Sequence, residues 1–267
     1  MLLVLLTLTT LTTARSLNDP LPSFRLSLTL ADHAVLLKNV PNTLWGFAPP
    51  GAVVTARLDG APAGVPGAAG SDGVWRVVLP AQPAGGPHVI DFASSDGSAP
   101  LQMGDVLFGE VFACGGQSNM AFSVSEAYNA STEEQAANAY PFVRHMTVPP
   151  GQPHGTATDL AKVVPWALAS NVTVGALSAV CWFHAKRLVD TGALGTPPTP
   201  IGLIANSVGG TAIEYWSTLE SRKACDDPSL NPPSPAPATD GDLFASMIAP
   251  FTTGPTALAG WLWFQVS

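Results

Sequence analysis

Hydrophobic and polar residues alternate along the first third of the chain, between Phe24 and about Gln102. A period of two is typical of β-strands with one buried face, and several of these segments end at Asp-Gly pairs, which are typical of tight turns between strands. No stretch of this region has a helical period, so we predict a small β-sandwich. The predicted strands are 24–30, 52–58, 74–79 and 88–92.

The pattern changes at Val106, where near-continuous apolar runs begin to alternate with amphipathic stretches. An apolar run is typical of a strand covered on both faces, and its alternation with helices predicts an α/β fold with a parallel sheet between two helical layers. The Pro-rich segment 224–241 is predicted to be a surface loop. The predicted strands are 106–114, 142–148, 201–206 and 261–265, and the predicted helices are 175–189 and 242–251.

One serine stands where the first of these apolar runs stops. The run from Val106 ends at Gly115 and Gly116 and is followed by Gln117-Ser118-Asn119. This order puts Ser118 at the carboxyl end of a strand, where open α/β sheets bind ligands, and the free amides of a following helix could stabilise an oxyanion there. The alternative is that Ser118 only caps that helix, which is the commoner role for a serine at this spacing.

The hexapeptide 115–120, GGQSNM, resembles the nucleophile motif of the sialate O-acetylesterase family and of related carbohydrate acetylesterases, which are SGNH hydrolases. The resemblance implies that Ser118 is the nucleophile, that its own amide helps to bind the oxyanion, and that Gln117 and Asn119 contribute to the same site. It also implies a three-layer α/β/α sheet, incomplete here, in residues 105–267. Two segments of the earlier region, ADHAVLL and DGVWRVVLP, resemble the β-domain that precedes the catalytic domain in that family.

A second strand also ends in a glycine pair, Gly209-Gly210, before a polar turn. Thr211 and Glu214 have the spacing of a capping box, which predicts that a helix starts at Thr211. The glycines could serve the turn alone, or they could let a backbone amide approach an oxyanion. The segment resembles the family's second block, GGT followed by an acidic residue and Trp, which implies an oxyanion role for Gly210, with Gly209 beside it.

A serine nucleophile needs a neighbouring base, and none of the histidines lies in a motif that identifies it as one. The family's base comes from an Asp-X-X-His element, but no Asp of this sequence stands three residues before a His. The family's triad is therefore incomplete here. The five histidines are His33, His88, His145, His154 and His184.

The last residues resemble a third block of the family, of the type WYQGE, up to Gln265, which the resemblance places at the active site. After Gln265 the match stops at Val266-Ser267. Gln-Val-Ser can be encoded as an exon end followed by a GT-type intron donor, so we expect a truncated or unspliced gene model and an inactive chain as given. The resemblance covers residues 24–265.

Composition narrows the class of protein further. With 46% hydrophobic and 11% charged residues, the chain is expected to be globular and well packed. The net charge of -8, with only 11 Lys and Arg, gives no basic face for nucleic acid. No cysteine pair has metal-ligand spacing, and neither a metal nor an organic cofactor is implied.

Residues 1–16 are apolar and end in small residues, as a secretory signal peptide does. We therefore predict a secreted or lysosomal protein with domains at 17–104 and 105–267. No later segment has the run of about 18 apolar residues that a membrane-spanning helix needs. The sequons at Asn129 and Asn171 fit a secretory route.

The three cysteines are an odd number, which predicts a free thiol or a partner outside the chain. Cys114 lies in an apolar strand and is expected to be a small buried hydrophobe. A disulfide between Cys181 and Cys225 is possible.

These patterns lead to one main functional hypothesis and two alternatives. The main hypothesis is a serine esterase that removes O-acetyl groups from sialic acids or related sugars through an acyl-enzyme, with an acetylated carbohydrate as its partner. The first alternative is an esterase of acetylated plant polysaccharide. The second is a secreted carbohydrate-binding protein without turnover, which the absence of an Asp-X-X-His from the transcript would favour.

Overall fold

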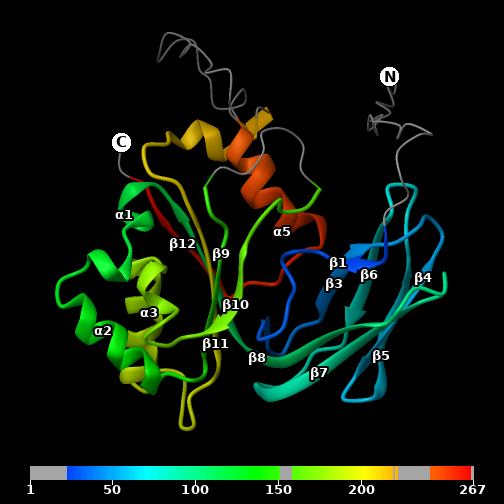
Figure 1. The fold of residues 1–267 in the computed structure, drawn as a ribbon, viewed down its shortest axis with the longest axis horizontal. Helices are drawn as coiled ribbons and strands as arrows, with labels where there is room; N and C mark the ends of the chain where they lie inside the picture. Colours follow the sequence, from blue (N-terminus) through cyan, green and yellow to red (C-terminus); the bar gives the residue numbers. More distant parts are fainter. Residues whose placement is uncertain (1–22, 151–157, 219, 222–240, 266–267) are drawn as a thin grey trace, which may run out of the picture.

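The computed structural model describes residues 23–150, 158–218, 220–221 and 241–265. The strands of these residues form one continuous hydrogen-bonded sheet that crosses the whole molecule, in the order β1-β3-β6-β5-β4-β7-β8-β11-β9-β10, with β12 and β2 also paired to β8 (Figure 1). The strands are β1 (Arg25–Leu26), β2 (Val35–Leu37), β3 (Asn42–Phe47), β4 (Val53–Leu58), β5 (Ala61–Ala68), β6 (Val74–Leu79), β7 (Gly85–Ser94), β8 (Leu101–Gly116), β9 (Val143–Thr147), β10 (Val164–Leu168), β11 (Ile201–Ser207) and β12 (Gly260–Phe264).

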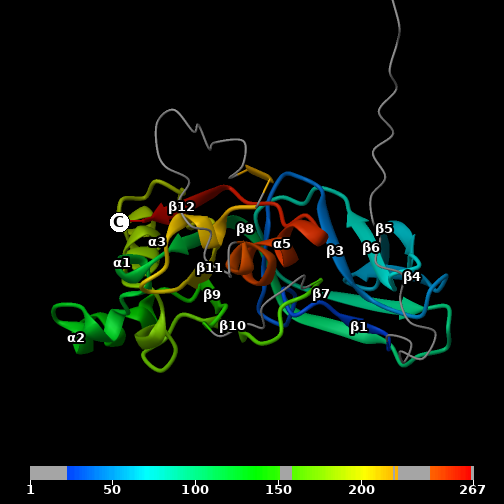
Figure 2. The same cartoon turned by 90° about the horizontal axis from the view of Figure 1, so that it is seen from above.

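The helices α1, α2 and α3 gather at the end of the sheet opposite to β4, β5 and β6, whereas α5 lies nearer the middle, between β8 and β3 (Figure 2). The α-helices are α1 (Ser118–Ala121), α2 (Ala130–Ala136), α3 (Ala179–Asp190) and α5 (Ala249–Thr253), with short 3-10 turns at η1 (Val124–Glu126), η2 (Ala137–Ala139), η3 (Val174–Ala176) and η4 (Ile213–Trp216), and a π-turn at η5 (Phe244–Ile248). Within the described residues, no helix is long and apolar enough to cross a membrane.

The amino-terminal strands pair with one another in antiparallel fashion, and only the short β2 pairs with β8 in parallel among the described residues before β8. The predicted strands 52–58, 74–79 and 88–92 are found as β4, β6 and β7, whereas β2, β3 and β5 were not predicted. The prediction of a strand over 24–30 is wrong beyond Leu26. There the hydroxyl of Ser27 accepts the amide of Thr29 and donates to Asp159, so these side-chain bonds replace the ladder.

The boundary predicted between residues 104 and 105 falls inside β8, a strand of 16 residues that continues without a break from the antiparallel to the parallel part. The predicted β-sandwich is not confirmed, because hydrogen bonds through β5 and β8 join the amino-terminal strands to the rest of the sheet. The division into two domains stays a prediction.

The carboxyl-terminal half has the predicted α/β architecture. The end of β8 lies between β11 and β12, and both pair with it in parallel, while β9 pairs in parallel with β11. One buried cluster packs α3 against this sheet, and another packs η5 and α5 against it. The predicted strands 142–148, 201–206 and 261–265 are confirmed as β9, β11 and β12.

The two predicted helices differ from the structure in detail. The predicted helix 175–189 begins only at Ala179, after the 3-10 turn η3, because Ser178 caps it by accepting the amide of Cys181. The predicted helix 242–251 is divided into η5 and α5, with Pro250 at the start of α5. Most of the predicted loop 224–241 lies outside the described residues.

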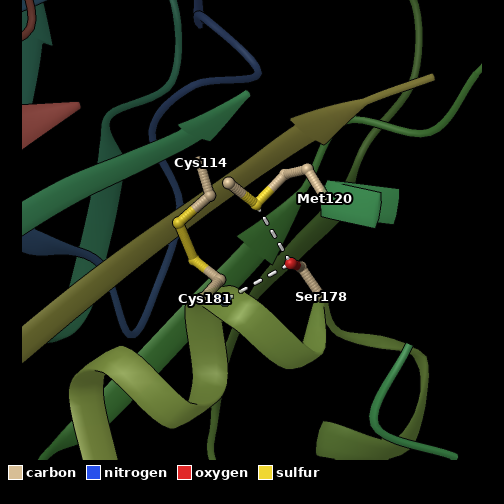
Figure 3. Close-up of a disulfide and its surroundings, with 4 residues drawn as sticks. All are labelled: Cys114, Met120, Ser178 and Cys181. Atoms are coloured by element: carbon tan, nitrogen blue, oxygen red, sulfur yellow. Dashed lines mark hydrogen bonds between the residues drawn. A yellow bond between two sulfur atoms is a disulfide. The ribbon is translucent and has the colours of Figure 1, made fainter. Parts of the chain in front are cut away.

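A disulfide between Cys114 and Cys181 joins β8 to α3 (Figure 3), and its two Cα atoms lie 6.0 Å apart. The prediction of Cys114 as an unpaired buried hydrophobe is therefore wrong, although the residue is fully buried. The possible pairing of Cys181 with Cys225 is excluded by the same bond. The cause is tertiary, because α3 packs with its first turn over the end of β8 and so brings together residues 67 positions apart.

Candidate active site

Three motifs far apart in the sequence end at the same edge of the sheet. The ends of β11 and β12 are both in register with Gly116, the last residue of β8, through Ser207 and Phe264. Beyond the strands, the amide of Val208 donates to the carbonyl oxygen of Gly116 at 3.1 Å, and the amide of Gln117 donates to that of Phe264 at 3.0 Å. The turn after β11 is therefore hydrogen-bonded to the end of β8, and the turn after β8 is hydrogen-bonded to the end of β12.

Ser118 is the first residue of α1 and is exposed. The capping alternative is wrong, because Gln117 holds the cap position and no side chain caps this helix. The turn forms because the carbonyl oxygen of Gln117 accepts the amides of Met120 and Ala121, both at 2.9 Å. The Ser118 hydroxyl donates to Oε1 of Gln117 at 3.0 Å, so the side chain of Gln117 orients the serine.

The glycine pair before Ser118 has a packing cause. A Cβ at Gly115 would lie 2.6 Å from the ring of Trp263 and 2.8 Å from Nε1 of Trp261. Gly116 has a φ of +134°, and its Cβ would overlap the carbonyl group of Phe264. The two glycines thus let β12 lie against the end of β8, which brings the third motif to the serine.

The second glycine pair lies beside the serine. A Cβ at Gly209 would lie 3.6 Å from Cα and 3.7 Å from Cβ of Ser118, so the backbone at Gly209 adjoins Ser118. Gly210 has a left-handed φ of +74°, which favours glycine, and nothing lies within 4 Å of its Cβ position. Within the described chain, neither glycine amide donates a hydrogen bond.

The predicted helix start at Thr211 is wrong. The helical turn η4 begins at Ile213, and its cap residue Ala212 makes no side-chain cap. The hydroxyl of Thr211 is already used, because it donates to the carbonyl oxygen of Val208 at 2.7 Å and accepts the indole N–H of Trp216 at 3.0 Å. It therefore closes the glycine turn instead of capping a helix.

Gln265 lies against the same turn, where its Nε2 donates to the carbonyl oxygen of Thr211 at 2.7 Å. The other side-chain oxygen, Oε1, is buried without a partner among the described residues. Asn119 is exposed on α1. The sheet thus brings Gln117, Ser118 and Gln265 to one edge with the glycine pair, and the oxyanion and substrate roles expected for this set stay predictions.

A cavity of about 220 Å³ opens beside this turn, on the α1 side. Small side chains and hydroxyl groups form most of its wall. The residues that line it are Ala121, Thr147, Val148, Pro150, Ala176, Ser178, Ala205, Ser207, Val208 and Gly209.

Two histidines of the amino-terminal region, His33 in the turn before β2 and His88 on β7, pair with carboxylates. Nδ1 of His33 lies 2.8 Å from Asp105, and Nδ1 of His88 lies 2.7 Å from Asp59. Both are thus used in surface pairs, and neither contacts Ser118.

Among the described residues, the two histidines of the parallel part, His145 and His184, have no hydrogen-bonded carboxylate. His145 is buried in β9 with both ring nitrogens unpartnered, and burial lowers its pKa to about 4. His184 packs its ring against the edge of Phe112, and burial lowers its pKa as well. His154 lies outside the described residues. Over the described part of the chain, the partner of the Ser118 hydroxyl is therefore Gln117 and not a histidine.

Two features near the turn were not predicted. Asn206 is fully buried at the end of β11, where its amide donates to the carbonyl oxygen of Met247 at 3.4 Å. A polar residue at the end of an apolar strand was its signal in the sequence. Trp216 and Trp263 meet edge to face at 5.3 Å over the glycine pair of β8, a contact that no local pattern indicates. Nowhere in the described ranges do three or more His, Cys, Asp or Glu side chains group closely enough to hold a metal ion.

Comparison with known proteins finds relatives that carry the same name, sialate O-acetylesterase. No family model matches the chain. The chain is 34% identical to sialate O-acetylesterase of Homo sapiens over 259 residues, which are 91% of this chain and 48% of the human protein. It is 36% identical to sialate O-acetylesterase of Mus musculus over 212 residues, 74% of this chain and 38% of the mouse protein. The chain therefore spans about half the length of these relatives or less.

A solved structure, described as that of a novel carbohydrate acetylesterase from Xanthomonas citri, matches with a TM-score of 0.76 and 31% identity. The match covers 91% of this chain and 51% of that protein. The fold and the serine at the end of β8 thus define the class, an α/β protein of the carbohydrate acetylesterase type. Within this class, the curated relatives that the chain matches over 91% of its own length are sialate O-acetylesterases.

Proposed function

We propose that this chain carries the nucleophile and part of the oxyanion site of a serine esterase that removes O-acetyl groups from sialic acids or other acetylated sugars. The observation that carries the proposal is the exposed Ser118 at the end of a buried parallel strand, with the backbone at Gly209 against it. The names of the relatives, sialate O-acetylesterase and carbohydrate acetylesterase, support an acetylated sugar as the substrate.

In the proposed reaction, Oγ of Ser118 attacks the acetyl carbonyl carbon, and the carbonyl oxygen becomes an oxyanion. The amide of Ser118 has no acceptor among the described residues, as expected for the first turn of a helix. The amide of Gly210 is also unused and belongs to a turn that adjoins the serine. Two such donors would lower the barrier by stabilising the developing negative charge. Collapse of the intermediate releases the sugar hydroxyl, and water then hydrolyses the acetyl-enzyme.

The proton of the Ser118 hydroxyl needs an acceptor, and the amide oxygen of Gln117 is too weak a base to take it. In the family the acceptor is the histidine of an Asp-X-X-His element, which this sequence does not contain. We therefore propose that residues 1–267 by themselves turn over acetyl esters far more slowly than a form that also supplies this histidine. The oxyanion donors and substrate binding alone give only a small acceleration.

The test is a comparison of variants of the form that carries the Asp-X-X-His, with 4-methylumbelliferyl acetate and an O-acetylated sialic acid as substrates. Ser118→Ala should lower kcat by about a thousandfold or more, because nucleophile and base act as a unit. Ser125→Ala is the matched control, since Ser125 is also exposed and, among the described residues, its hydroxyl bonds only to Ser123. Turnover that survives Ser118→Ala at its original rate would remove Ser118 from the mechanism.

Comparison of acetylated xylan with the O-acetylated sialic acid separates the alternatives. Hydrolysis of acetylated xylan in preference to the sialic acid would favour the plant-polysaccharide esterase. Binding of the acetylated sugar by isothermal calorimetry without turnover, in a form that contains the histidine, would favour the carbohydrate-binding protein.

We further propose a secreted or lysosomal location with glycans at the two sequons. Both Asn129 and Asn171 are exposed, so a glycan attached at either position would face solvent. The disulfide between Cys114 and Cys181 is consistent with this proposal, because disulfides persist in oxidising compartments.

A further inference from the structure

The short helix that carries Ser118 is attached to α3 on both sides of the serine. On the first side, Cys114 stands four residues before Ser118 and is bonded to Cys181 in the first turn of α3. Figure 3 shows the bond crossing from the end of β8 to the helix. Both cysteines are fully buried, so the attachment lies inside the core that packs α3 on the sheet.

On the second side, Met120 stands two residues after Ser118 and contacts the cap of α3. The hydroxyl of Ser178, the cap residue, accepts the amide of Cys181 at 3.3 Å and donates to Sδ of Met120 at 3.3 Å (Figure 3). Ser178 is thus hydrogen-bonded both to Cys181, which carries the disulfide, and to Met120. We call the four residues Cys114, Cys181, Ser178 and Met120 the brace.

The segment after α1 also follows the start of α3. The amide of Ala179 donates to the carbonyl oxygen of Phe122 at 2.8 Å, and the amide of Val124 donates to that of Leu177 at 2.9 Å. These backbone bonds hold the exit of α1, whereas the brace holds its entry and its buried face. Together they determine where α1 lies on the sheet.

The helix α1 cannot hold this position by itself. It has four residues, no side-chain cap and one buried side chain, that of Met120. A helix of one turn is unstable in water without tertiary contacts. The direction of the exposed Ser118 hydroxyl therefore depends on what α1 is attached to.

We propose that the brace positions Ser118 for acyl transfer, so that Cys114, Cys181, Ser178 and Met120 are positioning residues of the esterase site. The proposal rests on the proposed function of Ser118. Loss of the brace should loosen α1 locally and reduce the rate of the chemical step. For Cys114, Cys181 and Met120, which are fully buried and do not line the cavity beside the turn, substrate affinity should stay unchanged, whereas Ser178 also lines that cavity.

Hydrogen exchange of the chain itself tests the attachment. The reference is Cys225→Ala, which removes the third cysteine and keeps the brace. In this background, Cys114→Ala with Cys181→Ala removes the disulfide, Ser178→Ala removes the hydroxyl, and Met120→Leu removes the sulfur acceptor at similar volume. Ser246→Ala is the matched control, since Ser246 is equally buried but lies in η5, outside the brace.

We expect amide exchange in a peptide covering 117–121 to become about fivefold faster or more in each brace variant, as for the loss of one hydrogen bond or more. A peptide covering 74–79 of β6 should not change, and Ser246→Ala should resemble the reference in both peptides. Equal acceleration in both peptides would make the brace a general stabiliser and overturn the proposal. No acceleration over 117–121 would also overturn it.

Reduction gives an independent arm. Dithiothreitol donates two electrons and two protons to the disulfide, so Cys114 and Cys181 become thiols and the reagent becomes a cyclic disulfide. Because both sulfur atoms are buried, we expect slow reduction, followed by the same acceleration over 117–121. Fast reduction without a change in exchange would contradict a brace at this position.

Residual hydrolysis of 4-nitrophenyl acetate reports on the serine itself. We expect kcat to fall about fivefold or more in the disulfide and Met120 variants with KM unchanged, since the lost contacts act on the nucleophile and not on the ester. A rise in KM alone would assign the brace to substrate binding and overturn the positioning role. If the reference protein shows no Ser118-dependent turnover, as expected of a chain without the base histidine, the exchange data decide whether the brace holds α1. Failure of the proposed function is instead seen with Ser118→Ala in the form that carries the Asp-X-X-His.

Discussion

Substitution of Gly116 by Ala tests why a glycine precedes the catalytic turn. The φ of +134° at Gly116 is rarely adopted by residues with a side chain, and its Cβ would lie 2.8 Å from the carbonyl carbon and 3.0 Å from the nitrogen of Phe264. These are backbone atoms of β12, so they cannot rotate away as a side chain could. An alanine must therefore move β12 away from β8.

The expected loss of stability combines two effects. A non-glycine residue in such a backbone conformation costs about 1–3 kcal/mol. Forcing an extra carbon into a packed contact costs roughly another 1–3 kcal/mol. We therefore expect Gly116→Ala to lower the free energy of unfolding by about 4 kcal/mol, a large part of the roughly 5–15 kcal/mol of a typical domain. Separation of the strands also breaks the hydrogen bond from the amide of Gln117 to Phe264.

Urea unfolding followed by tryptophan fluorescence measures this loss, because Trp261 and Trp263 cover Gly115, next to the substituted residue. The matched control is Gly104→Ala in the same strand, where the nearest atom to a Cβ is a carboxylate oxygen of Asp32 at 3.7 Å. The control should change stability by less than about 1 kcal/mol. If the two alanine variants unfold at the same urea concentration, the close approach of β12 does not explain the glycine.

Three further outcomes follow from the structure. Replacement of Cys114 and Cys181 by Ala should lower the free energy of unfolding by about 4 kcal/mol, since the bond closes a loop of 67 residues in the unfolded chain. The measurement is the urea midpoint of this variant compared with that of Cys225→Ala, and equal midpoints would contradict the prediction. Burial lowers the pKa of His145 from 6.5 to about 4, so the unfolded chain binds the extra proton, and stability should fall by about 3 kcal/mol as the pH drops from 6.5 to 4. His145→Phe should remove that part of the slope in pH-dependent denaturation, and an unchanged slope would show that His145 is not responsible. Expression in a eukaryotic secretory host should give a product that loses mass with an endoglycosidase, and Asn129→Gln with Asn171→Gln should abolish the shift; an unglycosylated wild-type product with Met1 intact would refute the secretory proposal.

The sequence alone determined the elements whose pattern is local. The period of two predicted β4, β6 and β7, and the apolar runs predicted β9, β11 and β12. These predictions were possible because the order of apolar and polar residues in a strand depends directly on whether one or both of its faces are buried. The glycine pairs indicated the two turns at the edge of the sheet where β8 and β11 end, and the motif GGQSNM indicated Ser118. The family resemblance was confirmed by relatives that are 34% identical to the chain over 259 aligned residues.

The predictions that failed locally did so where a side chain formed a hydrogen bond other than the expected one. The hydroxyl of Thr211 bonds to Val208 and Trp216, so the capping box suggested by its spacing does not form. Ser27 bonds to Asp159, more than 130 residues away, and the predicted first strand ends early. The spacing of residues does not show which of several possible hydrogen bonds a side chain makes.

Only the tertiary structure decided which motifs meet at the serine. Parallel pairing of β8 with β11 and β12 brings Gly209 and Gln265 to the turn of Ser118, and a pairing register depends on contacts of the whole sheet. The same holds for the disulfide, because Cys114 and Cys181 meet only after α3 has packed on β8. Residue order specifies what each element is, whereas the packing of elements far apart in the chain specifies which side chains become neighbours.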